Sequence, residues 1–102
     1  MRRLAVLEAA VEQETPFGGR SRLWEAAADL WVALTPGPAR VVADRGGRPR
    51  LVETARAVTR DHPEAERGMR LGLDGRSWTV LRVERGAPAP GRMTLHLESE
   101  SE

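Results

Sequence analysis

The clearest alternation of hydrophobic and polar positions lies in the second half of the chain. Met69, Leu71 and Leu73 alternate with arginine, glycine and aspartate, which is the pattern of a strand with one buried face. Asp74-Gly75 follows, and the next run is rich in residues that favour strands. Asp-Gly between two such runs predicts a tight turn, because a type I′ turn needs a positive φ at both central residues. We therefore predict a β-hairpin here.

Two stretches in the first half of the chain fit a helix and a strand equally well. Residues 4–12 are apolar and rich in alanine, so intrinsic propensity alone favours a helix. In residues 22–35 the apolar positions fit both the helical period and strict alternation, and the alanine-rich middle favours a helix in isolation. Periodicity does not choose between the two structures at either stretch.

The remaining segments are short and are separated by turn signals. Residues 15–19 contain Pro and Gly-Gly, and the loops predicted at residues 36–50 and 86–91 are also rich in these two residue types. Residues 51–60 and the alternating run 93–98 predict strands. Short strands with turns between them indicate an all-β antiparallel barrel or sandwich. The predicted core residues are Leu30, Val32, Leu34, Met69, Leu71, Leu73, Trp78, Val80, Met93, Leu95 and Leu97.

Composition limits the class of protein. The chain of 102 residues is long enough for one domain with a modest core, which we place in residues 1–97, and its 40% hydrophobic content predicts folding. It has no run of 18 apolar residues, so we predict no membrane-spanning segment. Glu8 comes too early for the apolar region of a signal peptide, and the lack of cysteine excludes disulfides and thiolate metal sites. We expect the protein to be intracellular when it is made.

Charge is unevenly distributed, although the net charge is only +1. All 16 basic residues are arginine, which fits either a GC-rich genome or contacts with phosphate and carboxylate groups. The predicted loop at 36–50 is the most basic segment, and a loop of this length is commonly functional or disordered. Residues 98–102 form a predicted acidic tail, which is most simply read as a solvated terminus. The loop arginines are Arg40, Arg45, Arg48 and Arg50, and the tail acids are Glu98, Glu100 and Glu102.

No constellation of residues suggests catalysis. His62 and His96 lack the spacing to carboxylates that a metal site needs, and the chain has no lysine, tyrosine or cysteine. Trp24, Trp31 and Trp78 could stack on bases, but we predict that Trp31 and Trp78 belong to the core. We expect neither an enzyme nor a cofactor. A small single-stranded nucleic-acid-binding barrel that uses Trp24 and the arginine-rich loops remains an alternative.

The order of several short motifs resembles that of the phage head–tail joining family, also called head-closure or stopper proteins. The resemblance covers residues 4–98 as an ordered set, and no single motif is specific. It departs near the end of the middle strand, where an Arg-Tyr pair common in the family is replaced by Thr59-Arg60-Asp61. The matching residues are Pro16-Phe17-Gly18-Gly19, Trp24, Leu30-Trp31-Val32-Ala33-Leu34, Pro36, Thr54, Arg56, Val58, Arg67-Gly68-Met69-Arg70, Asp74-Gly75-Arg76, Trp78-Thr79-Val80 and Arg92-Met93-Thr94-Leu95.

The resemblance implies a fold for the ambiguous segments. Residues 4–12 and 22–35 correspond to strands in this family, and the second strand is long and can contain a β-bulge. This implication overrides the helical propensity of the two segments. The implied fold is a small antiparallel β-barrel with a long insertion loop between the second and third strands. Residues 36–50 lie at that insertion.

The resemblance also implies a function in assembly. Such proteins form a ring, here of six or twelve copies, below the portal and adaptor of a tailed phage or a gene transfer particle. The ring closes the channel that holds packaged double-stranded DNA and gives the tail a docking surface. Adaptor and tail-terminator rings of the same neck are alternatives. We expect assembly in the bacterial cytoplasm, with no membrane.

Within that function the charged segments receive specific roles. The four arginines of residues 36–50 would face DNA phosphates or acidic partner surfaces in the channel. The tail acids Glu98, Glu100 and Glu102 would dock on a basic neighbouring component of the neck.

Overall fold

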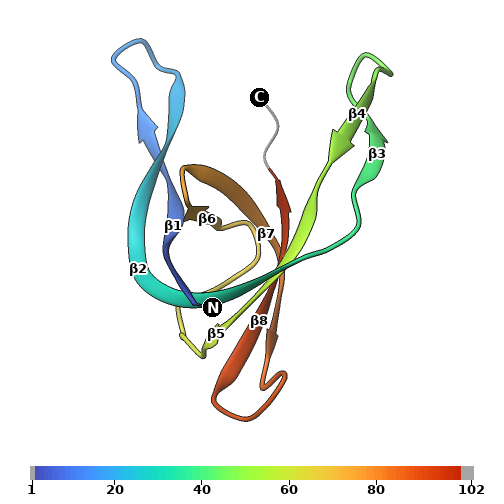
Figure 1. The fold of residues 1–102 in the computed structure, drawn as a ribbon. Coiled ribbons are helices and arrows are strands. Elements are labelled where there is room, and N and C mark those ends of the chain that lie inside the picture. Colours follow the sequence, from blue (N-terminus) through green and yellow to red (C-terminus); the bar gives the residue numbers. More distant parts are fainter. Residues whose placement is uncertain (1, 100–102) are drawn as a thin grey trace.

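The computed structural model describes residues 2–99, which form eight strands and no helix (Figure 1). Every pairing between neighbouring strands is antiparallel. The all-β antiparallel prediction is therefore confirmed. The strands are β1 (Arg3–Glu14), β2 (Arg20–Pro36), β3 (Arg40–Ala43), β4 (Pro49–Val52), β5 (Thr54–Arg60), β6 (Arg70–Leu73), β7 (Arg76–Arg85) and β8 (Arg92–Ser99).

Six of the strands close on themselves. Their order is β1-β2-β5-β8-β7-β6, and the ring closes where β6 pairs with β1, so they form a closed barrel. Closure pairs the two edges of the barrel sheet where β6 meets residues 6–8 of β1, which protects that part of the sheet from association with other strands. Strands β3 and β4 form a separate two-stranded sheet that projects from the barrel (Figure 1).

Both segments of ambiguous periodicity are strands, as the resemblance implied, and the helical propensity was misleading. Their alternation places Ala5 and Leu7 of β1 and Leu30 and Val32 of β2 in the core, and all four are buried. Leu7 pairs with Ala28 and Glu8 pairs with Ala26, so Ala27 is an extra residue that forms a bulge in β2. Burial in the barrel therefore outweighs the small helical preference of alanine.

The hairpin between β6 and β7 has the predicted turn. Asp74 has a φ of 52° and Gly75 a φ of 77°, which are the positive values that a type I′ turn requires. Leu73 pairs with Arg76 directly across this two-residue turn. The turn fixes the register that places Leu71 and Trp78 opposite one another in the core.

The core fills the barrel with side chains from all six of its strands. Ten of the eleven predicted core residues are buried, and Leu34 is partly buried and packs against them. Trp78 is 4% exposed, whereas Trp31 is 61% exposed, so the prediction that Trp31 belongs to the core is wrong. Leu30 and Val32 on either side face inward, and alternation along the strand therefore turns Trp31 outward.

The insertion between β2 and β5 is not the irregular loop that its glycines and prolines suggested. β3 pairs with β4 across a short turn, in which the Oδ1 atom of Asp44 accepts hydrogen bonds from the backbone N–H groups of Gly46 and Arg48, each at 2.9 Å. The predicted strand at 51–60 is divided between β4, which ends at Val52, and β5, which begins at Thr54. We call residues 40–52 the hairpin arm.

The last strand is longer than the sequence suggested. β8 continues to Ser99, so Glu98 lies in a strand and pairs with Thr54 of β5 and Thr79 of β7. Glu100 and Glu102 lie outside the described residues. Within residues 2–99 there is no helix of the length and apolar character needed to cross a membrane.

Candidate functional site

The structure separates the four arginines that the sequence assigned to one DNA-facing loop. Arg40 lies at the base of the hairpin arm, where its guanidinium is 2.7 Å from the Glu98 carboxylate of β8. Arg50 is half-buried on β4. Only Arg45 and Arg48 are exposed at the tip, and neither forms an ion pair within residues 2–99. The free positive charge of the arm is therefore concentrated at its tip.

The base of the arm is fixed to β5. The backbone N–H of Gly37 donates to the carbonyl of Thr54 at 2.8 Å, and the Thr54 hydroxyl donates to the carbonyl of Pro38 at 2.6 Å. A Cβ atom at position 37 would lie 2.6 Å from the Thr54 Oγ1 atom, so this close approach requires glycine. Together with the Arg40–Glu98 pair, these bonds hold the arm against the barrel strands β5 and β8.

One face of the hairpin arm is apolar and open to solvent. Val41 and Leu51 are opposite one another in register, and they are 67% and 64% exposed. Ala43 and Pro49, the next pair on the same face, are also exposed. A two-stranded hairpin is marginally stable alone, and a continuous apolar face of this kind is typical of a protein interaction surface. Sequence reasoning missed it because the segment was assigned to a loop.

The end of the β1–β2 hairpin also projects from the barrel (Figure 1). β6 pairs with β1 only at residues 6–8, so beyond Glu8 the β1 residues pair with β2 alone. Phe17 in the turn is 98% exposed, and Leu23 on β2 is 46% exposed. The molecule therefore presents two projecting hairpins with uncovered apolar side chains.

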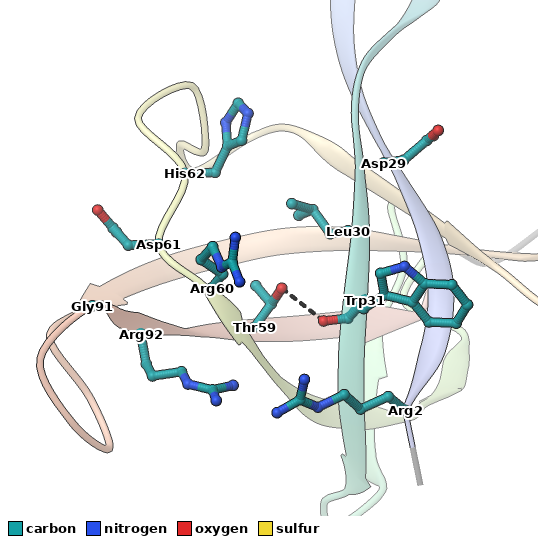
Figure 2. A pocket seen from close by; sticks show the side chains of 10 residues that line it. All are labelled: Arg2, Asp29, Leu30, Trp31, Thr59, Arg60, Asp61, His62, Gly91 and Arg92. Atoms are coloured by element: carbon teal, nitrogen blue, oxygen red, sulfur yellow. Dashed lines mark hydrogen bonds between the residues drawn. The ribbon is translucent and has the colours of Figure 1, made fainter.

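A pocket of about 360 Å³ lies at the end of the barrel where β5 ends and β8 begins (Figure 2). We call it the arginine pocket, because Arg2, Arg60 and Arg92 line it and none of the three forms an ion pair within residues 2–99. Figure 2 shows Arg2 and Arg92 reaching toward each other from opposite sides of the opening. Charge repulsion among the three guanidinium groups favours occupation of the pocket by an anionic group.

The other walls of the arginine pocket are formed by an exposed aromatic ring and the end of β5. Trp31 lies at the rim, and its carbonyl accepts a hydrogen bond of 2.8 Å from the Thr59 hydroxyl, which ties β2 to β5. Asp61 also lines the pocket, but its carboxylate is 2.7 Å from the guanidinium of Arg85. No local sequence motif identifies this pocket, because its residues come from four separate segments of the chain.

The two histidines lie in different polar settings. His62 lines the arginine pocket, and its Nδ1 atom accepts a hydrogen bond of 3.2 Å from the backbone N–H of Glu64. His96 lies on β8 beside Glu84 of β7. No three metal-binding side chains gather in the described part of the chain.

The side chains of Glu84 and His96 lie within hydrogen-bond distance of each other on the outer surface of β7 and β8. The Nε2 atom of His96 is 3.0 Å from Glu84 and 3.0 Å from Arg82, so it can donate to the first or accept from the second. The hydrogen bond from His96 lowers the pKa of Glu84 below its ordinary value of 4.5, and the positive charge of Arg82 lowers this pKa further.

We expect the free energy of unfolding of the Glu84→Gln variant to fall less steeply at acidic pH than that of the native chain. A carboxyl group with a lowered pKa in the folded state stabilises it above the unfolded pKa, and this contribution is lost as the pH falls through the folded value. Urea denaturation between pH 3 and pH 7 should therefore show a steeper loss below about pH 4.5 for the native chain than for the variant. Parallel curves would contradict the assignment.

Comparison with solved structures shows that this fold is shared. A chain in the virion of a native gene transfer agent (GTA) particle aligns with a TM-score of 0.71 and 24% identity, over 97% of this chain and 94% of that chain. Protein SF1141 from Shigella flexneri 2a aligns with a TM-score of 0.70 and 14% identity, over 100% of this chain and 95% of that one. No model of a protein family matches the sequence, and no curated protein is similar to it. The likeness therefore concerns the fold of the whole chain.

Proposed function

We propose that this chain is a structural component of the neck of a tailed phage or phage-like particle. Copies form a ring, of six or twelve, that closes the DNA channel below the portal and adaptor and gives the tail a docking surface. The observation that carries the proposal is the match of fold, over nearly the whole of both chains, to a chain of a gene transfer agent virion. The ordered motifs of the head–tail joining family support the position in the neck.

The exposed surfaces of the chain support a role in assembly. In a cyclic ring each subunit contacts its neighbours through two different patches. The apolar face of the hairpin arm at Val41 and Leu51 and the projecting Phe17 are uncovered in the single chain and would be covered by neighbours. Shape and mutual contact then perform the function, and no chemical step is required.

The hairpin arm is the part of the chain that we assign to the channel. Its tip carries Arg45 and Arg48 on a narrow projecting support, and arms from several copies could meet on the axis of a ring. Guanidinium groups in that position would contact DNA phosphates or acidic surfaces of the adaptor. Because Arg40 is paired with Glu98, we assign it to holding the arm in place.

Retention of packaged DNA tests this assignment. Serine at all four arm arginines, Arg40, Arg45, Arg48 and Arg50, should lower the fraction of DNA-filled particles, and Arg45→Ser with Arg48→Ser should account for most of the loss. The matched control replaces the same four residues with lysine, which keeps the charge. Particles would be counted by electron microscopy, with neck composition checked by immunolabelling. Normal retention with four serines would refute the gating role, and absence of the chain from the neck would refute the proposed function.

The structure does not favour the alternative of a single-stranded nucleic-acid-binding barrel. That function needs free aromatic faces for base stacking. The ring of Trp24 is covered by the guanidinium of Arg70 at 4.5 Å, and Trp78 is buried. Trp31 and Phe17 are widely exposed. Trp31 pairs with Leu4 near the start of β1, whereas Phe17 lies in the turn at the other end of the β1–β2 hairpin, so the two rings do not form one stacking platform.

A further inference from the structure

We propose that the arginine pocket binds the acidic C-terminal segment, residues 100–102, of a second copy of this chain. The inference deepens the proposed ring and rests on it, because it names one contact through which neighbouring copies are joined. The pocket contributes Arg2, Arg60 and Arg92, and the segment contributes the carboxylates of Glu100 and Glu102. The carboxylate of Glu98 is already paired with Arg40.

The charge of the pocket selects an anionic occupant. Its three arginines form no ion pair within residues 2–99, and the carboxylate of Asp61 is already paired with Arg85. Figure 2 shows the Asp29 carboxylate directed away from Arg2 and Arg92. Guanidinium groups bind carboxylates through paired N–H donors, which makes two or three convergent arginines an effective carboxylate site.

The size of the pocket and the apolar surface beside it favour a peptide over a nucleic acid. A volume of about 360 Å³ is at the small end of ligand pockets and suits one or two glutamate side chains. The exposed ring of Trp31, with Leu4 directly opposite it on β1, offers an apolar shelf for the peptide backbone.

The segment must come from another copy, because its own pocket is out of reach. β8 begins at Arg92 in the pocket and ends at Ser99. Seven steps along a strand at about 3.3 Å each place Ser99 roughly 23 Å away from Arg92. Three further residues to Glu102 extend by at most about 11 Å, which is less than half of that distance. The contact therefore joins two different patches on two copies, which is also what a head-to-tail contact in a closed ring requires.

Peptide binding to the isolated protein tests the proposal. The probe is a fluorescently labelled peptide with the sequence of residues 95–102. The receptor is the full chain with Glu100→Gln and Glu102→Gln, which removes competition from the C-terminal segments of other receptor copies. Fluorescence anisotropy should report saturable binding that weakens as salt is added. Arg60→Ser with Arg92→Ser should weaken binding by about tenfold or more, since each lost guanidinium–carboxylate contact is a charge-assisted hydrogen bond.

Two controls separate the pocket from general charge attraction. Arg45→Ser with Arg48→Ser removes the same net charge from the arm tip and should leave peptide affinity unchanged within about twofold. A peptide with glutamine at all three glutamates should not bind. Equal affinity of the Arg60/Arg92 variant and the native receptor would overturn the proposal, and so would an equal affinity of the glutamine peptide. Circular dichroism melting of each variant establishes that the receptor is folded.

The outcome also separates this inference from the proposed function. A short DNA duplex that displaces the peptide and binds more tightly than it would overturn the inference in favour of a nucleic-acid site. Particles that contain the chain in the neck, combined with no peptide binding, would leave the ring intact and refute this contact alone. Peptide binding combined with absence of the chain from the neck would refute the proposed function while the contact between copies stands.

Discussion

The Leu95→Ala variant is expected to lose about 2–5 kcal/mol of its free energy of unfolding, the usual cost of removing a large side chain from a packed core. Leu95 has no exposed surface and lies in the middle of β8, between Ala57 of β5 and Val83 of β7. Alanine already occupies the neighbouring position on β5, so little side-chain volume is available there to fill the cavity. A domain of this size has a total stability of about 5–15 kcal/mol, so the loss is a large part of it.

Urea denaturation followed by circular dichroism measures this loss, and a lower thermal midpoint by roughly 4–8 °C per kcal/mol gives an independent reading. The matched control is Leu81→Ala, which removes the same atoms from the extra residue of the β7 bulge, where the side chain is 42% exposed. We expect the control to lose less than about 1 kcal/mol. Equal losses in the two variants would show that the barrel interior is not the main source of stability.

The parts of the fold that the sequence predicted depend on local patterns. The turn at Asp74-Gly75 was predictable because few residue pairs adopt two positive φ angles, and the alternation on both sides of it fixes which side chains are buried. The same reasoning identified the inward-facing residues of β8, including Met93 and Leu97. In each case a short segment contains all the information that determines its structure.

Segments whose structure depends on distant partners were harder to predict. The alanine-rich residues of β1 and β2 become strands because they pair with each other and with β6 and β5, which local propensity does not register. The hairpin arm up to Arg50 was assigned to a loop because its strands have four residues each and are flanked by glycine and proline. Short strands give too few alternations to outweigh such turn signals.

The candidate functional surfaces also divide into features that local sequence reveals and features that depend on distant residues. Arginine density drew attention to the insertion, but sequence spacing could not show that Arg40 pairs with Glu98, which lies 58 residues away. The arginine pocket escaped detection because its residues share no motif, and because Trp31 had been assigned to the core. A residue of β2 that alternates with two buried neighbours would have been assigned correctly once the strand was known.

The Arg70→Ala variant is expected to lose about 2 kcal/mol through damage to the seam that closes the barrel. Arg70 of β6 and Glu8 of β1 are register partners on that seam, with Nε 3.0 Å from Oε1 and Nη2 3.4 Å from Oε2 of the carboxylate. The same guanidinium lies 4.5 Å from the ring of Trp24. Both charged side chains are only about one-fifth exposed, so the cost lies between that of an exposed pair, about 0–1 kcal/mol, and that of a buried one, about 3–5 kcal/mol.

Arg76→Ala is a close control, because Arg76 also pairs with a glutamate, Glu53 at 2.8 Å, and also lies over a tryptophan ring, at 4.7 Å. Its ion pair is about half exposed and does not join β6 to β1, so we expect a loss below about 1 kcal/mol. Arg70→Lys should recover less than half of the loss, since an ammonium group cannot form the two-pronged contact. If Arg70→Ala and Arg76→Ala lose the same free energy of unfolding in urea denaturation, the prediction is wrong. Neither the lower solvent exposure of the Arg70 pair nor its position between β6 and β1 would then add to stability. A larger loss at Arg70, reduced when Glu8→Gln is added, would place the cost in the carboxylate left without its partner.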